Sequence, residues 1–154
     1  MNQQRRDALR ITTVLGLAVA AGLISPADAL AAETWNTAAF DTKNLNDTVK
    51  ALGGSSAAIS KDLVISAPDI AENGAVVPVS VSTTLAGVQQ IAILVEKNPN
   101  ALSANFTIPA GTEAYVSTRV KMAQTSNVFA LAKVDGKWLV ASKEIKVTLG
   151  GCGG

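Results

Sequence analysis

The residue with the most distinctive chemistry is the single cysteine, which is the third residue from the C-terminal end. Cys152 is flanked by two glycines on each side, Gly150 and Gly151 before it and Gly153 and Gly154 after it. Because glycine has no Cβ and loses the most freedom on ordering, this run predicts a flexible arm. Three residue steps beyond Leu149, the extended arm would carry the sulfur about 10 Å from the folded body. A thiol on a thin, neutral arm favours delivery into the narrow active site of another protein.

A frayed terminus and a lipid anchor could also place a cysteine near a chain end. Chain ends are often frayed and rich in glycine, so the cysteine could be incidental. We favour a carrier arm, because an exposed thiol is a liability and a symmetric glycine pattern is unusual. Lipid attachment is disfavoured, since a prenylation box needs another ending and a bacterial lipoprotein cysteine directly follows a signal peptide. A lone cysteine cannot form an internal disulfide, so Cys152 is either reactive or paired between chains.

The rest of the composition offers no catalytic or metal-binding set. Histidine is absent, which excludes Ser-His-Asp and Cys-His constellations and every metal site with a histidine ligand. One cysteine also excludes thiolate clusters, so no metal or cofactor is expected. Cys152 has no neighbouring Lys or Arg and lies near the terminal carboxylate, so its pKa should be near or above about 8.5. Low self-reactivity suits a substrate carrier that partner enzymes act upon, rather than an enzyme.

Residues 1–31 are predicted to be an export signal. Arg5 and Arg6 form a charged region that precedes a mildly apolar stretch, and Ala29-Leu30-Ala31 gives a small-residue cleavage pattern. The apolar stretch is too short to span a bilayer. The arginine pair resembles a twin-arginine signal, although Gln4 and Ala8 depart from that pattern. The expected location is the periplasm, and the mature chain should begin near residue 32.

The mature chain is long enough for one domain with its own core. The full sequence has 13 Lys and Arg residues, of which three precede residue 32, and 12 Asp and Glu residues, of which two do. The mature chain therefore has ten basic and ten acidic residues. No basic patch or charge run stands out. This pattern argues against nucleic acid as a partner and against an electrostatic membrane anchor.

Residues 32–60 are expected to form an N-terminal helical segment. Leu45, Val49 and Leu52 recur at helical spacing, and Asn44 is a candidate N-cap. Two successive glycines directly after Leu52 should end the helix. The segment therefore predicts one short helix before the main domain.

From residue 61 to residue 149 the apolar period is two, which is typical of strands. Turn signals separate the alternating runs, including Asn73-Gly74 and the hairpin pair Asp135-Gly136. Pro78 should mark an edge or a bulge. The pattern predicts an all-β, immunoglobulin-like sandwich of about seven strands, followed by the arm at residues 150–154. The expected runs are Leu63-Ile65, Val77-Val81, Ile91-Val95, Leu102-Ile108, Ala114-Val120, Val128-Val134 and, from Lys143, Ile145-Leu149.

The sandwich itself shows no convincing site. Asp62, Asp69 and Glu72 could meet near one loop, but acids around turns usually serve solvation and capping. Arg119 and Lys121 alternate on one strand, which is typical of a solvated face. The chemistry therefore stays with Cys152.

Several stretches resemble the SoxY family of the periplasmic thiosulfate-oxidising Sox system. They are the export signal, the terminal GGCGG, Ser117-Thr118-Arg119-Val120, and Ala67-Pro68-Asp69-Ile70-Ala71-Glu72-Asn73-Gly74 leading into Val76-Val77-Pro78-Val79. The resemblance implies that Cys152 holds sulfur intermediates such as a persulfide or a thiosulfonate. By the same resemblance, the expected partners are a SoxZ-like subunit in a heterodimer, a haem-containing SoxAX-like conjugating enzyme, a SoxB-like hydrolase and a SoxCD-like sulfane dehydrogenase.

Two alternatives from other functional classes stay open. A diglycine sulfur carrier would use a thiocarboxylate on Gly154, although the export signal and the strand pattern count against this cytoplasmic chemistry. A structural sandwich would use Cys152 to link two subunits by a disulfide. Mass analysis of the modified atom would distinguish a thiocarboxylate on Gly154 from sulfur on Cys152. Non-reducing gels would show a disulfide-linked dimer.

Overall fold

The computed structural model describes residues 36–148. Two helices come first, α3 (Thr37–Phe40) and α4 (Leu45–Ala51). Nine strands follow in the described part of the chain: β1 (Ala57–Ile59), β2 (Leu63–Ser66), β3 (Ile70–Ala71), β4 (Val77–Thr83), β5 (Val88–Val95), β6 (Leu102–Thr107), β7 (Tyr115–Val120), β8 (Ser126–Val134) and β9 (Lys137–Val147).

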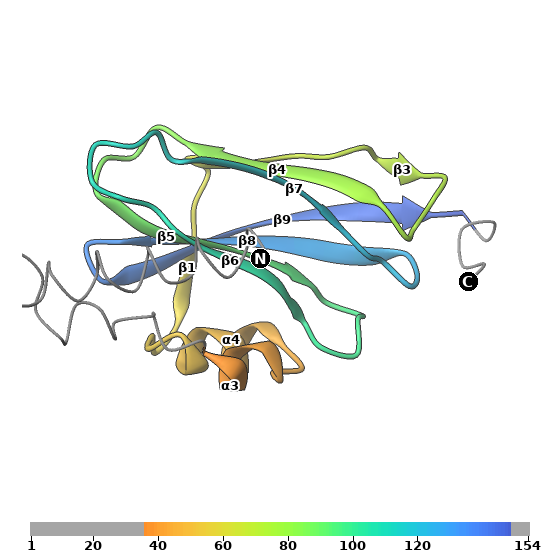
Figure 1. The fold of residues 1–154 in the computed structure, drawn as a ribbon, viewed down its shortest axis with the longest axis horizontal. Helices are drawn as coiled ribbons and strands as arrows, with labels where there is room; N and C mark the ends of the chain where they lie inside the picture. Colours follow the sequence, from red (N-terminus) through yellow and green to blue (C-terminus); the bar gives the residue numbers. More distant parts are fainter. Residues whose placement is uncertain (1–35, 149–154) are drawn as a thin grey trace, which may run out of the picture. The chain divides into compact units, whose positions relative to one another are not determined.

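The strands form two sheets that face each other, and the helices cover the outer face of one of them (Figure 1). The larger sheet has the order β1-β9-β8-β5-β6, with β3 added beside β9. The smaller sheet has the order β2-β4-β7. The larger sheet is therefore the middle layer, between the smaller sheet and the helices.

The middle position of the larger sheet explains why strand β5 is an almost unbroken apolar run. Ile91, Ile93 and Val95 are fully buried between the two sheets, and Ala92 and Leu94 are fully buried on the side of the helices. Successive side chains of a strand point to opposite faces, so burial on both faces requires apolar residues at every position.

Helix α4 begins where the sequence predicted. The Asn44 side chain accepts a hydrogen bond from the Asp47 backbone N–H at 2.9 Å, which satisfies one of the free donors of the first turn. Val49 and Leu52 then pack with Trp138 of β9 in the helix-side core. The helix therefore has a local start signal and an apolar face that anchors it to the larger sheet.

The predicted all-β sandwich with a short helix is confirmed, but the strand list needs correction. Helix α3 and strands β1 and β3 were not predicted, and β9 begins at Lys137 rather than at Lys143. The segment expected to be helical up to residue 60 therefore also contains β1. Strand β1 pairs in parallel with β9 but its three residues are mostly exposed, so it carries no alternating apolar pattern.

The predicted hairpin at Asp135-Gly136 is confirmed. Both residues have positive φ, 49° and 77°, as a type I′ turn requires, and the flanking Val134 and Lys137 are paired. Pro78 is paired with Arg119 of β7, while the pairing of β4 with β2 stops at Ser80. On the β2 side Pro78 thus lies at a local edge, where its missing N–H costs no ladder bond.

Candidate functional site at the end of strand β9

The residues predicted to carry the chemistry lie outside the described part of the chain. These are Cys152 with Gly150, Gly151, Gly153 and Gly154, together with Arg5 and Arg6 of the predicted signal. Their roles stay predictions. What the structure does show is the root of the predicted arm, which we define as residues 146–148.

On one side, the arm root is held by strand β3. The Lys146 N–H donates to the Asp69 carbonyl at 2.9 Å, and the Thr148 N–H donates to the Ala71 carbonyl at 3.1 Å. These bonds belong to a parallel pairing in which Ile70 lies opposite Lys146. Strand β3 therefore extends the pairing of β9 up to the last described residue.

On the other side of the arm root, a side chain provides the hydrogen-bond acceptor beyond the last residue pair of β8 and β9. The pairing of β9 with β8 ends at Ile145 opposite Ser126. Two residues later, the Val147 N–H donates to the Thr125 hydroxyl oxygen at 3.0 Å. Three successive N–H groups of the arm root thus have partners, on alternating sides of the strand.

Lys143 ties the chain before β3 to β9. Its Nζ donates to the Ala67 carbonyl at 2.5 Å and lies 3.0 Å from an Asp69 carboxylate oxygen. The Asp69 side chain is 89% exposed, whereas that of Lys143 is 29% exposed. An ion pair with so exposed a partner contributes little, so the bond to the half-buried carbonyl is the more important contact.

The turn after β3 is packed against the arm root. The Met122 N–H donates to the Gly74 carbonyl at 2.7 Å. A Cβ added at Gly74 would lie 2.8 Å from Cγ1 of Val147 and would also collide with the Met122 carbonyl oxygen. Ile145 is fully buried in the inter-sheet core, so the strand enters the arm root from a rigid position.

The charged residues singled out in the sequence form no site. Asp62 lies beside Asp135 and Lys137, whereas Asp69 contacts Lys143 near the other end of β9. Arg119 and Lys121 are exposed, as expected for a solvated face. Within residues 36–148, no group of three or more acidic, cysteine or histidine side chains could hold a metal ion.

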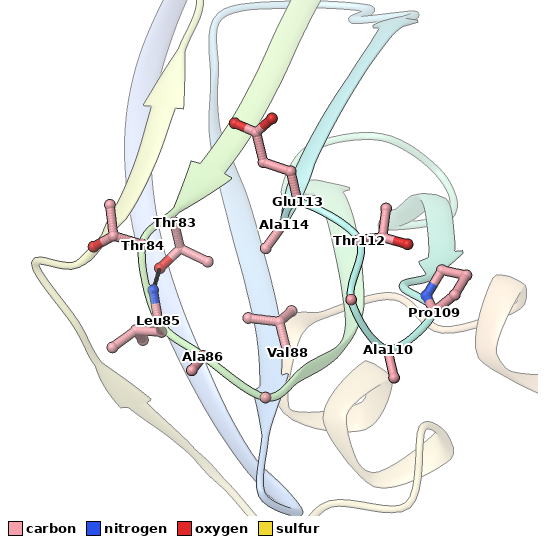
Figure 2. Close-up of a pocket in the computed structure, with 12 residues that line it drawn as sticks. Thr83, Thr84, Leu85, Ala86, Val88, Pro109, Ala110, Thr112, Glu113 and Ala114 are labelled. Carbon is pink, nitrogen blue, oxygen red and sulfur yellow. Dashed lines mark hydrogen bonds between the residues drawn. The ribbon is translucent and has the colours of Figure 1, made fainter.

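A hollow lies at the other end of strand β4 (Figure 2). It has a volume of about 680 Å³ and is lined by residues 83–88 and 109–114, among which Glu113 is the one charged residue. Strand β4 begins at Val77 near Gly74 and ends at Thr83 in this hollow, a separation of about 20 Å. Four residue steps from Thr148 span at most about 14 Å, which is less than the length of β4.

The outer face of the smaller sheet carries mostly hydroxyl groups. Ser80 and Ser117 are opposite each other and hydrogen-bonded at 2.9 Å, beside the exposed Tyr115. Hydrogen bonding with Ser80, and next with Ser117, lowers the pKa of Tyr115 below its ordinary value. No side chain here has the charge or the burial of a catalytic group. Among the described residues, no helix is long and apolar enough to cross a membrane.

The sequence did not indicate Thr125, Lys143 or strand β3 as part of the site. Thr125 lies in a turn-like Thr-Ser-Asn stretch, and Lys143 alternates with apolar residues like any solvated lysine. Their bonds join segments up to 76 residues apart, and no local pattern records such a contact.

Comparison with known proteins gives a consistent family assignment. Residues 49–152 match the family described as sulfur oxidation protein SoxY. Among solved structures, the sulfur carrier protein SoxY from Chlorobium limicola f thiosulfatophilum has 37% sequence identity and a TM-score of 0.59, over 67% of this chain and 96% of that chain.

A second solved structure, from a study of T cell activation by toxic shock syndrome toxin-1, has 11% identity and a TM-score of 0.39. It covers 56% of this chain and 99% of that chain. The comparison with curated proteins gave no match. The family match extends over all the described strands of the sandwich and ends on the single cysteine. This chain belongs to the SoxY family of sulfur oxidation proteins.

Proposed function

We propose that this chain is a sulfur carrier of thiosulfate oxidation, which holds sulfur intermediates covalently on Cys152 and presents them to partner enzymes. The observation that carries the proposal is the family match, which runs through the sandwich to the chain's single cysteine. The SoxY from Chlorobium limicola f thiosulfatophilum is itself described as a sulfur carrier protein.

The first proposed step is the oxidative conjugation of thiosulfate to the thiol. The Cys152 S–H bond is broken, a bond forms between its sulfur and the outer sulfur of thiosulfate, and one proton and two electrons are released. A haem-containing, SoxAX-like partner accepts the electrons. The product is an anionic thiosulfonate on Cys152.

The second proposed step is hydrolysis. Water attacks the terminal sulfone group, the sulfur–sulfur bond to that group breaks, and sulfate leaves with two protons. A SoxB-like hydrolase performs this hydrolysis. The persulfide that remains on Cys152 is then the substrate of a SoxCD-like dehydrogenase. In this scheme no side chain of this chain acts as acid or base, and the sequence contains no histidine.

The position of Cys152 in the chain supports this division of labour. It lies five residues beyond the end of β9, so a substitution there leaves both cores intact. We further propose a periplasmic location, reached through the signal containing Arg5 and Arg6, and a heterodimer with a SoxZ-like subunit. Light scattering would reveal higher oligomers, and non-reducing gels would reveal a disulfide through Cys152.

The test is the replacement Cys152→Ser. The hydroxyl is un-ionised at neutral pH and cannot form a persulfide or a thiosulfonate. The variant should fold and bind its partner subunit normally, with loss of all thiosulfate-dependent cytochrome reduction in a system reconstituted from the partner enzymes. Retained electron flow would contradict the proposal and reopen a thiocarboxylate on Gly154.

A further inference from the structure

The arm root, residues 146–148, is held on both of its sides. A side chain on the β8 side and a two-residue strand on the other side fix its last three N–H groups. We propose that Thr125, Lys143 and strand β3 form an anchor that sets the reach of Cys152, and that they are positioning residues for its delivery to partner enzymes. This inference rests on the proposed function.

The reach follows from chain geometry. With the anchor closed, Thr148 is the last held residue, and Cys152 follows it by four residue steps, or about 13 Å of fully extended chain. With the anchor open, the chain is free from Ile145 onward, and Cys152 lies seven steps away, or about 23 Å. The volume sampled by the thiol would increase roughly fivefold, and its effective concentration at a docked active site would fall correspondingly.

Strand β3 cannot hold the arm root alone. It contributes two residue pairs to a parallel ladder, and isolated pairs of strands are at best marginally stable in water. Ile70 is 57% exposed, so it adds little burial, whereas Ala71 is 5% exposed. Side-chain bonds on both sides must therefore supply the rest of the anchor's stability.

Thr125 and Lys143 supply those bonds in different ways. Thr125, which directly precedes β8, accepts the hydrogen bond from the Val147 N–H, so its loss leaves that N–H without this partner. Lys143 holds the Ala67 carbonyl and so fixes the connection that leads into β3. Because Asp69 is so exposed, Asp69→Asn should change the anchor far less than Lys143→Met does.

The first experiment measures the anchor itself by amide hydrogen exchange. Thr125→Val keeps the shape of the side chain but removes the acceptor, and Thr125→Ser keeps the acceptor. Exchange at Lys146, Val147 and Thr148 should accelerate at least tenfold in the valine variant and stay close to wild type in the serine variant. The amides of β5 serve as the internal reference, because global unfolding would accelerate them as well.

Lys143→Met is the second variant, with Lys146→Met as its control. Lys146 is an exposed lysine on the same strand, and its replacement leaves the anchor bonds in place. Exchange at the arm root should accelerate in the first variant only. Wild-type exchange in both Thr125→Val and Lys143→Met would overturn the anchor.

The second experiment measures reach. A nitroxide on Cys152, the single thiol of the chain, broadens the amide signals it approaches. In the wild type, broadening should be strongest at residues near the arm root, such as 72–76 and 121–125. In Thr125→Val it should increase at the far end of β4, around Thr83, which lies about 20 Å from Val77. An unchanged pattern would overturn the inference even if exchange has accelerated.

The third experiment connects reach to delivery. With the haem-containing conjugating enzyme, Thr125→Val should raise KM for the carrier about fivefold while kcat and the rate of Cys152 alkylation by iodoacetamide stay unchanged. Thr125→Ser should restore the wild-type KM. An unchanged KM would refute the positioning role alone, whereas turnover by Cys152→Ser would refute the proposed function.

Discussion

Gly74 shows how one residue connects the sandwich core to the arm root. It is buried, its carbonyl accepts the Met122 N–H, and a Cβ there would meet both Met122 and Val147. The need for glycine here is steric, because no positive φ is involved. The sequence predicted a turn at Asn73-Gly74 and was right, but it did not show that this turn packs against the end of β9.

Gly74→Ala should therefore destabilise the protein. Overpacking of a close-packed contact typically costs about 1–3 kcal/mol, because neighbouring atoms have to move. Urea denaturation followed by far-UV circular dichroism should give a lower midpoint with an unchanged slope. Ala75→Ser, at the exposed neighbouring position, is the control and should be close to neutral. A wild-type midpoint for Gly74→Ala would show that the turn can move away from β9 at no cost.

At the scale of residues, prediction succeeded where the physical cause is local. The Asn44 cap bonds three residues ahead, and the Asp135-Gly136 turn is set by its own φ angles. It failed at Lys143, whose partner Ala67 is 76 residues away. Whether Cys152 carries sulfur stays a prediction, because that residue lies outside the described chain.

At the scale of elements, helix α4 matters because it covers a face of the larger sheet that would otherwise meet water. Leu131 of β8 is fully buried in this helix-side core, with Val49 and Trp138 in the same cluster. The opposite face of β8 packs between the sheets through residues such as Ala130. The helices are thus a structural layer of the domain.

Leu131→Ala should cost about 2–5 kcal/mol of stability, as is usual for truncation of a fully buried leucine. Leu139→Ala, at a partly exposed position of β9, should cost less. Thermal unfolding of both variants provides the comparison. Equal losses of stability in the two variants would mean that burial of Leu131 beneath the helices adds no more stability than the partly exposed position of Leu139.

Element prediction depended on how many faces of each strand are buried. The alternating pattern identified β4 and β7 well, since each has one buried and one exposed face. Strands β1 and β3 were missed because three and two mostly exposed residues cannot show a period. The beginning of β9 was missed because Trp138 and Val140 bury against the helices while Leu139 points to the other face.

At the scale of the whole molecule, the fold places the end of β9 at one end of the sandwich (Figure 1). The contacts that hold this end come from β3 and from the loop before β8. The carrier proposal places its sulfur-bearing residue beyond this end of the sandwich.

Export provides a test at the same scale. If residues 1–31 are a twin-arginine signal, Arg5→Lys combined with Arg6→Lys should leave the precursor in the cytoplasm, because that pathway depends on the arginine pair. Cell fractionation and N-terminal sequencing would check the location and a start near residue 32. Normal export of the double variant would instead indicate the general secretory route.

The most direct test of the central claim is intact-mass analysis of the protein after turnover with thiosulfate and the partner enzymes. The wild-type chain should carry adducts with the masses of a thiosulfonate and a persulfide, both removable by a thiol reductant and both located by fragmentation on Cys152. The Cys152→Ser chain, treated identically, should carry none. An adduct that persists in the serine variant, or that maps to the Gly154 carboxylate, would contradict the carrier role of Cys152.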